Sequence, residues 1–562
     1  MRKNNNKSEN TEEIYAGTVD VEAIKNKLKK QKLILQSVFI LVFVLLGIFY
    51  FINRNNELAK QDYIGGNIIR LGNDGGSADG DTSVANPWTN PSFMNALVFK
   101  SLFLADSTFT EIMPCIGEKY ELLDDDMTYV ITINDDLFWS DGVPITVDDI
   151  VFSFEAFFKC TFVNSTLSAT FNRIEGVSDY VDGKSSTISG ITSSGNTVSF
   201  KLTAPYSNFA LMLTQFTPLP KHILEDTDLS TLTEGHEFFL NTNPICSGPY
   251  IVSSVDDNNN LVLTHNPYYT GAKSDIETIL MCWDYDNEVI DYYSTTDPTK
   301  MVSYRSMKGY VEYPIDVYFY RYFLFNLINT EDGSGSTAMD DVRVRQAIYH
   351  AIDIEKLASE LYFGKTTLVH GGSMNLANEL FEYNPEKAKE LLIEAGYDFD
   401  RPFHIAYYSG DATSRILVER VASYLEDVGL TVTYARTSSS SELYEEARYD
   451  ILLKNLSTLT VVDWYNEFLS TNTTITQILG DTGEFDDLIV SLTSASSSET
   501  YNEVLQQLVD LEQELLYKLP MFLLNDASYI NSNRLSVPDD MTFGNTRFLS
   551  DIRFDEWYVI KE

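Results

Sequence analysis

The stretch TYVITINDDLFWSDGVPITVDDIVFSFEAF, residues 128–157, carries three local structural signals in one run. Its first part alternates apolar and polar side chains, which predicts a half-buried strand over 127–134. Trp139-Ser-Asp-Gly142 favours a turn. Thr146 and Asp149 have the spacing of a capping box, so we expect an apolar helix over 150–158.

Strand and helix signals continue to alternate towards the C-terminus. Asp341 can cap a helix over 342–351, and Asn384 can cap another that ends before Gly396. The next predicted elements form a strand–helix–strand unit: 403–408, 414–428 and 430–435. Such alternation is typical of α/β lobes with mixed sheets.

The N-terminal region differs from the rest of the chain in charge and hydropathy. Residues 33–52 (LILQSVFILVFVLLGIFYFI) form a run of twenty uncharged residues. A helix of that length spans roughly 30 Å, the thickness of a bilayer's hydrocarbon core. Lysines crowd just before this run, which predicts a cytoplasmic N-terminus: Lys25, Lys27, Lys29, Lys30 and Lys32.

Residues 33–52 are longer than the apolar core of a usual secretory signal, and no small-residue cleavage site follows them. We therefore expect an uncleaved signal anchor, with a cleaved export signal as the alternative. The prediction is a short cytoplasmic tail (1–32), one transmembrane helix (33–52) and an extracellular remainder attached to the plasma membrane.

Charge excludes one class of partner. The 562 residues include 82 acidic and 40 basic side chains, for a net charge of −42. The first 52 residues carry +3, so the remainder carries −45. Because nucleic acid is a dense row of phosphates, this chain would repel it. The balance instead suggests a soluble, self-repelling surface.

The sequence shows no pattern for catalysis. It lacks a glycine-rich phosphate loop, a GxSxG and an HExxH motif, and its six histidines are scattered. We expect no catalytic residues, no metal site, no cofactor and no enzyme activity. The four cysteines are widely spaced, which leaves free thiols and one or two disulfides as alternatives: Cys115, Cys160, Cys246 and Cys282.

Four segments in order resemble one family, the family 5 solute-binding proteins of ABC importers, which include oligopeptide- and dipeptide-binding proteins. Residues 128–157 resemble its signature of an edge strand and a helix start. NPICSGPYIV (243–252) resembles its N-P-x-G-[ST]-G-P-Y motif. Residues 325–353 and 383–397 resemble two more of its motifs. The resemblance extends from about residue 65 to the C-terminus.

The resemblance implies an α/β, two-lobed periplasmic-binding-protein-like fold with an extra subdomain, preceded here by the N-terminal transmembrane helix. The first lobe would be discontinuous, and the second lobe would lie between its second and third segments along the chain. The implied boundaries are 62–95, 215–318 and 519–562 for the first lobe, 96–214 for the inserted subdomain and 319–518 for the second lobe.

The resemblance also implies candidate ligand-binding residues. In peptide-binding members, an Asp in a W-x-x-D-Y-x-x-P loop holds the α-amine of the peptide. The corresponding loop here is VVDWYNEFL (461–469), so Asp463 is the candidate, with Trp464 and Tyr465 beside it. The alternative for Asp463 is an exposed loop acid. Trp88 could stack on a ligand or fill a core.

The implied function is capture of a small oligopeptide outside the cell and its delivery to ABC permease subunits, by a monomer that closes its two lobes around the ligand. Three alternatives stay open. The first is a ligand-sensing receptor of the same fold, and the second is a binding protein for sugars. The third is an extracellular hydrolase, for which the sequence shows no site.

Overall fold

A computed structural model describes most of the chain after residue 66. The described ranges are 67–72, 86–89, 93–160, 163–232, 236–240, 244–256, 260–282, 290–328, 338–363, 366–372, 382–437, 439, 441–495, 498–544 and 548–561. The predicted transmembrane helix 33–52 and tail 1–32 lie outside them. No helix within these ranges is long and apolar enough to span a bilayer.

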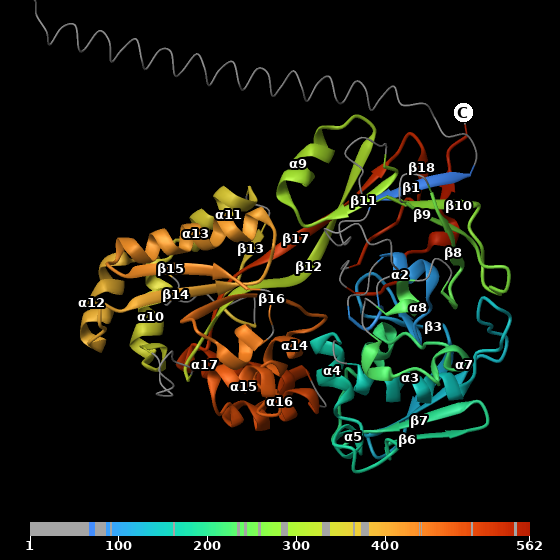
Figure 1. Cartoon of the computed structure of the whole chain (residues 1–562), viewed down its shortest axis with the longest axis horizontal. Helices are drawn as coiled ribbons and strands as arrows, with labels where there is room; N and C mark the ends of the chain where they lie inside the picture. Colours follow the sequence, from blue (N-terminus) through green and yellow to red (C-terminus); the bar gives the residue numbers. More distant parts are fainter. Residues whose placement is uncertain are drawn as a thin grey trace, which may run out of the picture. The chain divides into compact units, whose positions relative to one another are not determined.

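A mixed sheet of eleven strands runs through the described chain (Figure 1). Along the sheet the strands are β15 (Thr431–Arg436), β14 (Pro402–Tyr407), β16 (Ile451–Ser457), β12 (Tyr310–Phe325), β17 (Lys518–Asn531), β11 (Tyr292–Thr295), β1 (Ile68–Gly72), β10 (Thr278–Cys282), β9 (Leu261–His265) and β8 (Tyr250–Val255), with β13 (Thr366–Leu368) beside β17. We call the part built on β8–β11 and β1 the first lobe, and the part built on β13–β16 the second lobe.

Strands β12 and β17 belong to both lobes. The start of β12 pairs with the end of β17 beside β11, and the end of β12 pairs with β16. Between Ile315 and Phe319 the register shifts, because β12 advances four residues while β17 advances two, from Asp526 to Leu524. This irregularity lies where the two strands pass from one lobe to the other.

The predicted strand, turn and helix of 127–158 are confirmed in a smaller antiparallel sheet. Its order is β4 (Gly117–Leu122), β5 (Thr128–Ile133), β7 (Thr197–Lys201) and β6 (Ile191–Ser194). Helix α3 (Val147–Lys159) begins at the predicted capping box, in which the Asp149 carboxylate accepts from the Thr146 N–H at 2.8 Å. Phe154 of α3 stacks on Phe216 at 3.9 Å between ring centroids. Aromatic side chains therefore pack the core beneath α3.

The remaining elements are short strands and helices of mixed length, the longest of which, α13 and α17, belong to the second lobe. The other strands are β2 (Phe103–Ala105), β3 (Ile112–Pro114), β18 (Leu535–Ser536) and β19 (Tyr558–Val559). The helices are α2 (Phe93–Val98), α4 (Ser165–Phe171), α5 (Val177–Val181), α6 (Phe209–Met212), α7 (Lys221–Leu224), α8 (Glu237–Leu240), α9 (Pro298–Ser306), α10 (Val342–Ala351), α11 (Ile354–Tyr362), α12 (Pro385–Ala395), α13 (Ala412–Asp427), α14 (Val461–Asn466), α15 (Thr473–Leu479), α16 (Asp486–Thr493) and α17 (Ser498–Leu515).

The predicted helices of the second lobe are confirmed with their caps. The Asp341 side chain accepts from the Arg343 N–H at the start of α10, and the Asn384 side chain accepts from the Lys387 N–H at the start of α12. Gly396 ends α12 at a φ of 73°, where a residue with a Cβ would be strained. Helices α11 and α13 lie on one side of β14–β16, and α14–α16 lie on the other (Figure 1).

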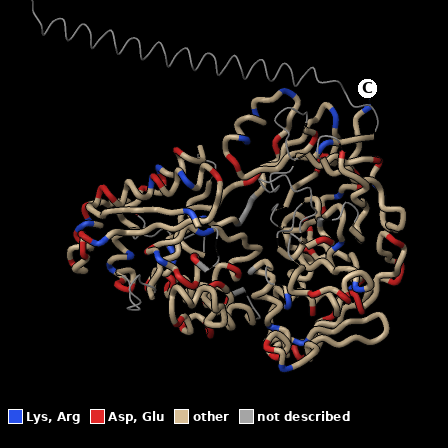
Figure 2. Tube along the Cα trace, in the orientation of Figure 1, with Lys and Arg blue, Asp and Glu red and all other residues tan. Residues whose placement is uncertain are grey.

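The described residues show how the acidic side chains are distributed and in which state the cysteines are. Acidic positions are spread over the elements of both lobes rather than gathered at one place (Figure 2). All four cysteines are described, and none of them forms a disulfide. Burial raises the pKa of the Cys246 thiol, which keeps it protonated.

Candidate functional site

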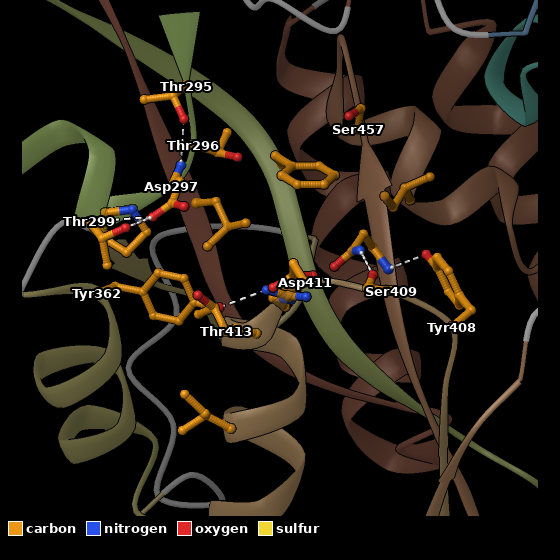
Figure 3. A pocket seen from close by; sticks show the side chains of 18 of the residues that line it. Thr295, Thr296, Asp297, Thr299, Tyr362, Tyr408, Ser409, Asp411, Thr413 and Ser457 are labelled. Carbon is orange, nitrogen blue, oxygen red and sulfur yellow. Dashed lines mark hydrogen bonds between the residues drawn. The ribbon is translucent and has the colours of Figure 1, made fainter. Parts of the chain in front are cut away.

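A cavity of about 770 Å³ lies between the two lobes (Figure 3). Pockets for small ligands usually measure about 300–1,000 Å³, so this one has room for a short peptide or a molecule of similar size. Its walls are rich in hydroxyl groups from distant parts of the chain: Thr89, Thr166, Thr295, Thr296, Thr299, Thr413, Ser409, Ser457, Tyr362 and Tyr408.

The alternation of strands β12 and β16 places side chains of both strands in the cavity wall. Arg321 stands opposite Asn455 in the antiparallel ladder, and Phe319 stands opposite Ser457. All four line the cavity. Because side chains of a strand alternate between faces, Tyr320, which lies between Phe319 and Arg321 in β12, points to the other face of the sheet, where it packs on Trp464.

Arg321 is the only basic residue among the described residues that line the cavity, and it is 4% exposed. Its Nη1 donates to the Tyr362 hydroxyl at 2.7 Å, and its Nη2 donates to the Ser414 Oγ. Its Nε has no hydrogen-bond partner among the described residues. Within the described residues it forms no ion pair with a carboxylate, so a buried positive charge faces the cavity without a direct counter-charge.

The two carboxylates in the cavity wall already cap helices. Asp297 precedes α9 and accepts from the Thr299 N–H at 2.8 Å and its hydroxyl at 2.7 Å. Asp411 precedes α13 and accepts from the Ser414 N–H at 2.7 Å and its hydroxyl at 2.5 Å. Ser414 thus stands between Arg321 and Asp411. Helix N-termini offset part of each negative charge.

Asn455 contributes an acceptor without a partner. Its backbone N–H donates to the Tyr408 hydroxyl at 3.2 Å, and its Nδ2 donates to the Ser409 Oγ at 3.4 Å. Its Oδ1 is buried and accepts no hydrogen bond from the part of the chain that the structure describes. Arg321 and Asn455, which stand opposite each other in the β12–β16 ladder, thus carry an unpaired donor (Nε) and an unpaired acceptor (Oδ1), respectively.

The predicted ligand loop at 461–469 is partly a helix, α14, which corrects the expectation of a loop. Asp463 lies in its first turn and is 4% exposed, so it is not an exposed loop acid. Its carboxylate accepts from the N–H groups of Leu459 at 2.9 Å and Thr460 at 3.0 Å. Burial raises the pKa of Asp463 to about 6, although these two hydrogen bonds oppose the rise.

Trp464 and Tyr465 lie on the sheet face opposite the cavity wall. The Trp464 Nε1 donates to one Glu512 oxygen at 2.8 Å, and the Tyr465 hydroxyl donates to the other at 2.9 Å. Glu512 also accepts from the Gly372 N–H at 3.2 Å. Both predicted residues are fully buried, and Trp464 packs on Tyr320 at 4.5 Å between centroids.

Buried ions surround Trp464. Glu467 pairs with Lys518 at 2.8 Å and with Lys454 at 3.2 Å, and accepts from the Tyr322 hydroxyl at 2.6 Å. Burial alone would raise the pKa of Glu467, but the two ammonium groups and the hydrogen bonds outweigh it and lower the pKa to about 2. This network holds α14 against β12, β16 and β17.

Trp88 fills a core in the structure. It is fully buried, and its Nε1 donates to the Thr217 carbonyl at 2.8 Å. Its ring stacks on Phe216 and meets the edge of Phe157. The four predicted ligand-binding residues do not line the 770 Å³ cavity. They are Trp88, Asp463, Trp464 and Tyr465. Ligand contact by these residues therefore stays a prediction.

Contacts between the region of α4–α6 and the second lobe lie close to α14. The Asn208 Nδ2 donates to the Thr460 Oγ1 at 3.1 Å, and Arg173 donates to the Asn466 Oδ1 at 3.2 Å. The Thr166 Oγ1 donates to the Ser457 carbonyl at 3.5 Å at the cavity wall. These hydrogen bonds link the region of α4–α6 to the second lobe.

Sequence reasoning missed Arg321, although a signal was present. FYRYFLF (residues 319–325) places one arginine inside an aromatic strand. A charge in such a strand is expensive to bury unless it is paired. Its presence there is therefore a reason to look for a ligand or an ion partner.

Comparisons with known proteins agree with this architecture. A family model described as bacterial extracellular solute-binding proteins, family 5 Middle, matches residues 111–485. The oligopeptide-binding protein OppA of Lactococcus lactis subsp. cremoris is 26% identical over 380 residues, which cover 59% of this chain and 62% of that protein. The chain thus spans less than two thirds of that relative's length.

Solved structures show the same fold. The murein tripeptide binding protein MppA of Escherichia coli aligns with 88% of this chain and 99% of its own, at 18% identity and a TM-score of 0.70. NikZ from Campylobacter jejuni, solved with Ni(L-His), aligns with 88% of this chain and 100% of its own, at 20% identity and a TM-score of 0.66. The fold is therefore the two-lobed α/β fold of periplasmic binding proteins.

Proposed function

The chain belongs to the family 5 bacterial extracellular solute-binding proteins, and we propose that it captures small oligopeptides and delivers them to the permease subunits of an ABC transporter. The family is one of binding proteins rather than enzymes. The protein would act as a monomer whose lobes close on the ligand, and the permease would recognise the closed form.

The observation that carries this proposal is the cavity of about 770 Å³ between the lobes. Its walls combine β11 and α9 of the first lobe with β16, α13 and the second-lobe end of β12, so a ligand there would contact both lobes. Such a ligand favours the closed state by its differential contacts with it. The hydroxyl groups of the wall offer hydrogen bonds to a peptide. Three aromatic rings of the wall offer it apolar surface, whatever its side chains: Phe319, Tyr362 and Tyr408.

Attachment to the plasma membrane through residues 33–52, with the N-terminus in the cytoplasm, is a second part of the proposal. It is supported by the twenty uncharged residues and the lysines before them. Resistance of the full chain to alkaline extraction from membranes, and protease sensitivity of the binding domain on intact cells, would test it. Release at high pH would contradict the anchor.

A sugar is the second candidate ligand, because ten of the lining side chains carry hydroxyl groups. Sugars are bound by many hydrogen bonds together with aromatic stacking. Arg321 distinguishes the two candidates, since a neutral sugar would leave its charge without a partner.

Peptide capture is tested with the full chain, freed of bound ligand by unfolding and refolding. The protein is incubated with a pool of tri- to pentapeptides, and in parallel with oligosaccharides, then separated by gel filtration. We expect retained peptides, a rise in Tm and a smaller radius of gyration by X-ray scattering. A ligand at a hundred times its Kd should add about 2.7 kcal/mol to the free energy of unfolding. Failure of every peptide to be retained would remove the peptide proposal.

A further inference from the structure

We infer that the ladder pair of Arg321 and Asn455 is a receptor for an acylated α-amino acid, such as the C-terminal residue of a peptide: Arg321 binds its carboxylate and Asn455 accepts its amide N–H. This inference rests on the proposed function and specifies the ligand of the same cavity.

Arg321 needs an anion that the described protein does not supply directly. A guanidinium has five N–H donors, and two of them are used, on Tyr362 and Ser414. Its side chain is 4% exposed, and its Nε is unpaired. Removing an ion from water costs several kcal/mol unless a counter-charge compensates. A carboxylate matches the fork of N–H groups, because it accepts two parallel hydrogen bonds.

Ser414 and Tyr362 position the guanidinium without neutralising it. Ser414 accepts from Arg321 and donates to Asp411, so the nearest lining carboxylate is one hydroxyl away from the guanidinium. Tyr362 holds the other side of the guanidinium from α11. With both Nη atoms held, less side-chain entropy remains to be lost when a ligand binds.

Asn455 would bind the amide N–H of the ligand, next to the carboxylate that Arg321 binds. Residues directly opposite in an antiparallel ladder have Cβ atoms about 4.5–5.5 Å apart. The buried Asn455 Oδ1 without a partner is therefore close to the Arg321 side chain. In an acylated amino acid, one carbon atom separates the carboxylate from the amide nitrogen. A single ligand residue can thus satisfy the donor and the acceptor of this pair.

The inference is tested by comparing tripeptides that have a free carboxylate with the same tripeptides as C-terminal amides, with N-acetyl amino acids as a third set. Full-length wild type is compared with Arg321→Gln. The matched control is Arg345→Gln, because Arg345 is also 4% exposed but donates to backbone carbonyls, including that of Leu515, away from the cavity. Binding of N-acetyl amino acids would point to a shorter natural ligand, and binding of tripeptides alone to a peptide.

We expect wild type and Arg345→Gln to bind the free acids roughly 10- to 100-fold more tightly than the amides, and Arg321→Gln to lose this ratio. A second variant covers the case in which Arg321→Gln does not fold. Asn455→Asp places a carboxylate beside Arg321, so it should raise the Tm of the ligand-free protein and weaken the free acids at least roughly tenfold.

Equal affinity of wild type for acids and amides, or an unchanged ratio in Arg321→Gln or in Asn455→Asp, would overturn the inference and leave the proposed function in place. Failure of wild type to bind any peptide would remove peptide capture instead. In that case sodium acetate replaces the peptides. A larger Tm rise over sodium chloride in wild type and Arg345→Gln than in Arg321→Gln would support the carboxylate receptor, and equal rises would overturn it.

Discussion

The Asp463 carboxylate accepts a 3.0 Å hydrogen bond from the backbone N–H of Thr460, the residue before helix α14. This arrangement repeats the capping box of Thr146 and Asp149 at the start of α3. Asp463 therefore has a structural role that does not depend on a ligand. Protonation of Asp463 should therefore change the free energy of unfolding.

Asp463→Asn should change the pH dependence of stability. The pKa is about 6 in the folded protein against an ordinary 3.8, so the folded state binds more protons between these values. Stability from this group is present at low pH and is lost as the pH rises through 6, by about 3 kcal/mol at pH 7. The variant should lack this loss. Urea unfolding at pH 4 and pH 7 measures it.

Asp125→Asn is the control, because the pKa of Asp125 is shifted in the opposite direction to that of Asp463. Hydrogen bonds from Thr128 and Met127 lower the pKa of the exposed Asp125, so its contribution is lost as the pH falls. The same pH trend in Asp463→Asn and wild type would contradict the assignment of Asp463. A tenfold loss of ligand affinity in Asp463→Asn would show that its carboxylate also contacts the ligand.

Glu467→Gln should destabilise the second lobe strongly. The substitution leaves two buried ammonium groups, Lys454 and Lys518, without their shared carboxylate. Breaking a buried pair in this way costs about 3–5 kcal/mol. Glu419→Gln, which breaks an exposed pair with Arg415, should cost about 0.5 kcal/mol or less. Similar losses in the two variants would show that the buried network is not needed for stability.

Asn208→Ala should shift the lobes towards an open state. The substitution removes the hydrogen bond to the Thr460 hydroxyl, which links the start of α6 to the second lobe. A ligand would then have to supply the lost free energy, so its Kd should rise roughly 2- to 10-fold. X-ray scattering of the ligand-free protein should show a larger radius of gyration. Asn172→Ala, which removes an exposed hydrogen bond to Ser168, should leave both values unchanged.

Trp88→Phe should lower stability and leave ligand affinity unchanged. Phenylalanine keeps the stacking on Phe216 but leaves the buried Thr217 carbonyl without its donor. We expect a loss of about 1–3 kcal/mol in the free energy of unfolding. A fall in affinity with unchanged stability would instead place Trp88 at the ligand, which is one of the two sequence-based interpretations of this residue.

Local signals predicted much of the fold because they depend on neighbouring residues. The strand, turn and helix of 127–158 were confirmed, and so were α10 and α12, because capping residues and periodicity act within one element. The strand–helix–strand unit at 402–436 was confirmed with shifts of one or two residues at its ends. The four ordered motifs predicted the family.

The site was harder to predict because it depends on contacts across the chain. Thr460 and Asp463 have the same spacing as Thr146 and Asp149, so a cap was the simpler interpretation of Asp463. Trp464 and Tyr465 contact Glu512, about fifty residues further along the chain. No local pattern indicates such a partner. The face of a strand that meets a cavity likewise depends on its neighbours in the sheet.

The central claim is that one solute binds in the cavity between the lobes. It is tested most directly by isothermal titration of a peptide retained by wild type into Thr413→Trp, in which an indole would fill the cavity beside Asp411. Thr431→Trp, on the exposed edge strand β15, is the control. We predict one site per chain in wild type and in the control, and at least roughly tenfold weaker binding in Thr413→Trp. Unchanged affinity in Thr413→Trp would contradict the claim.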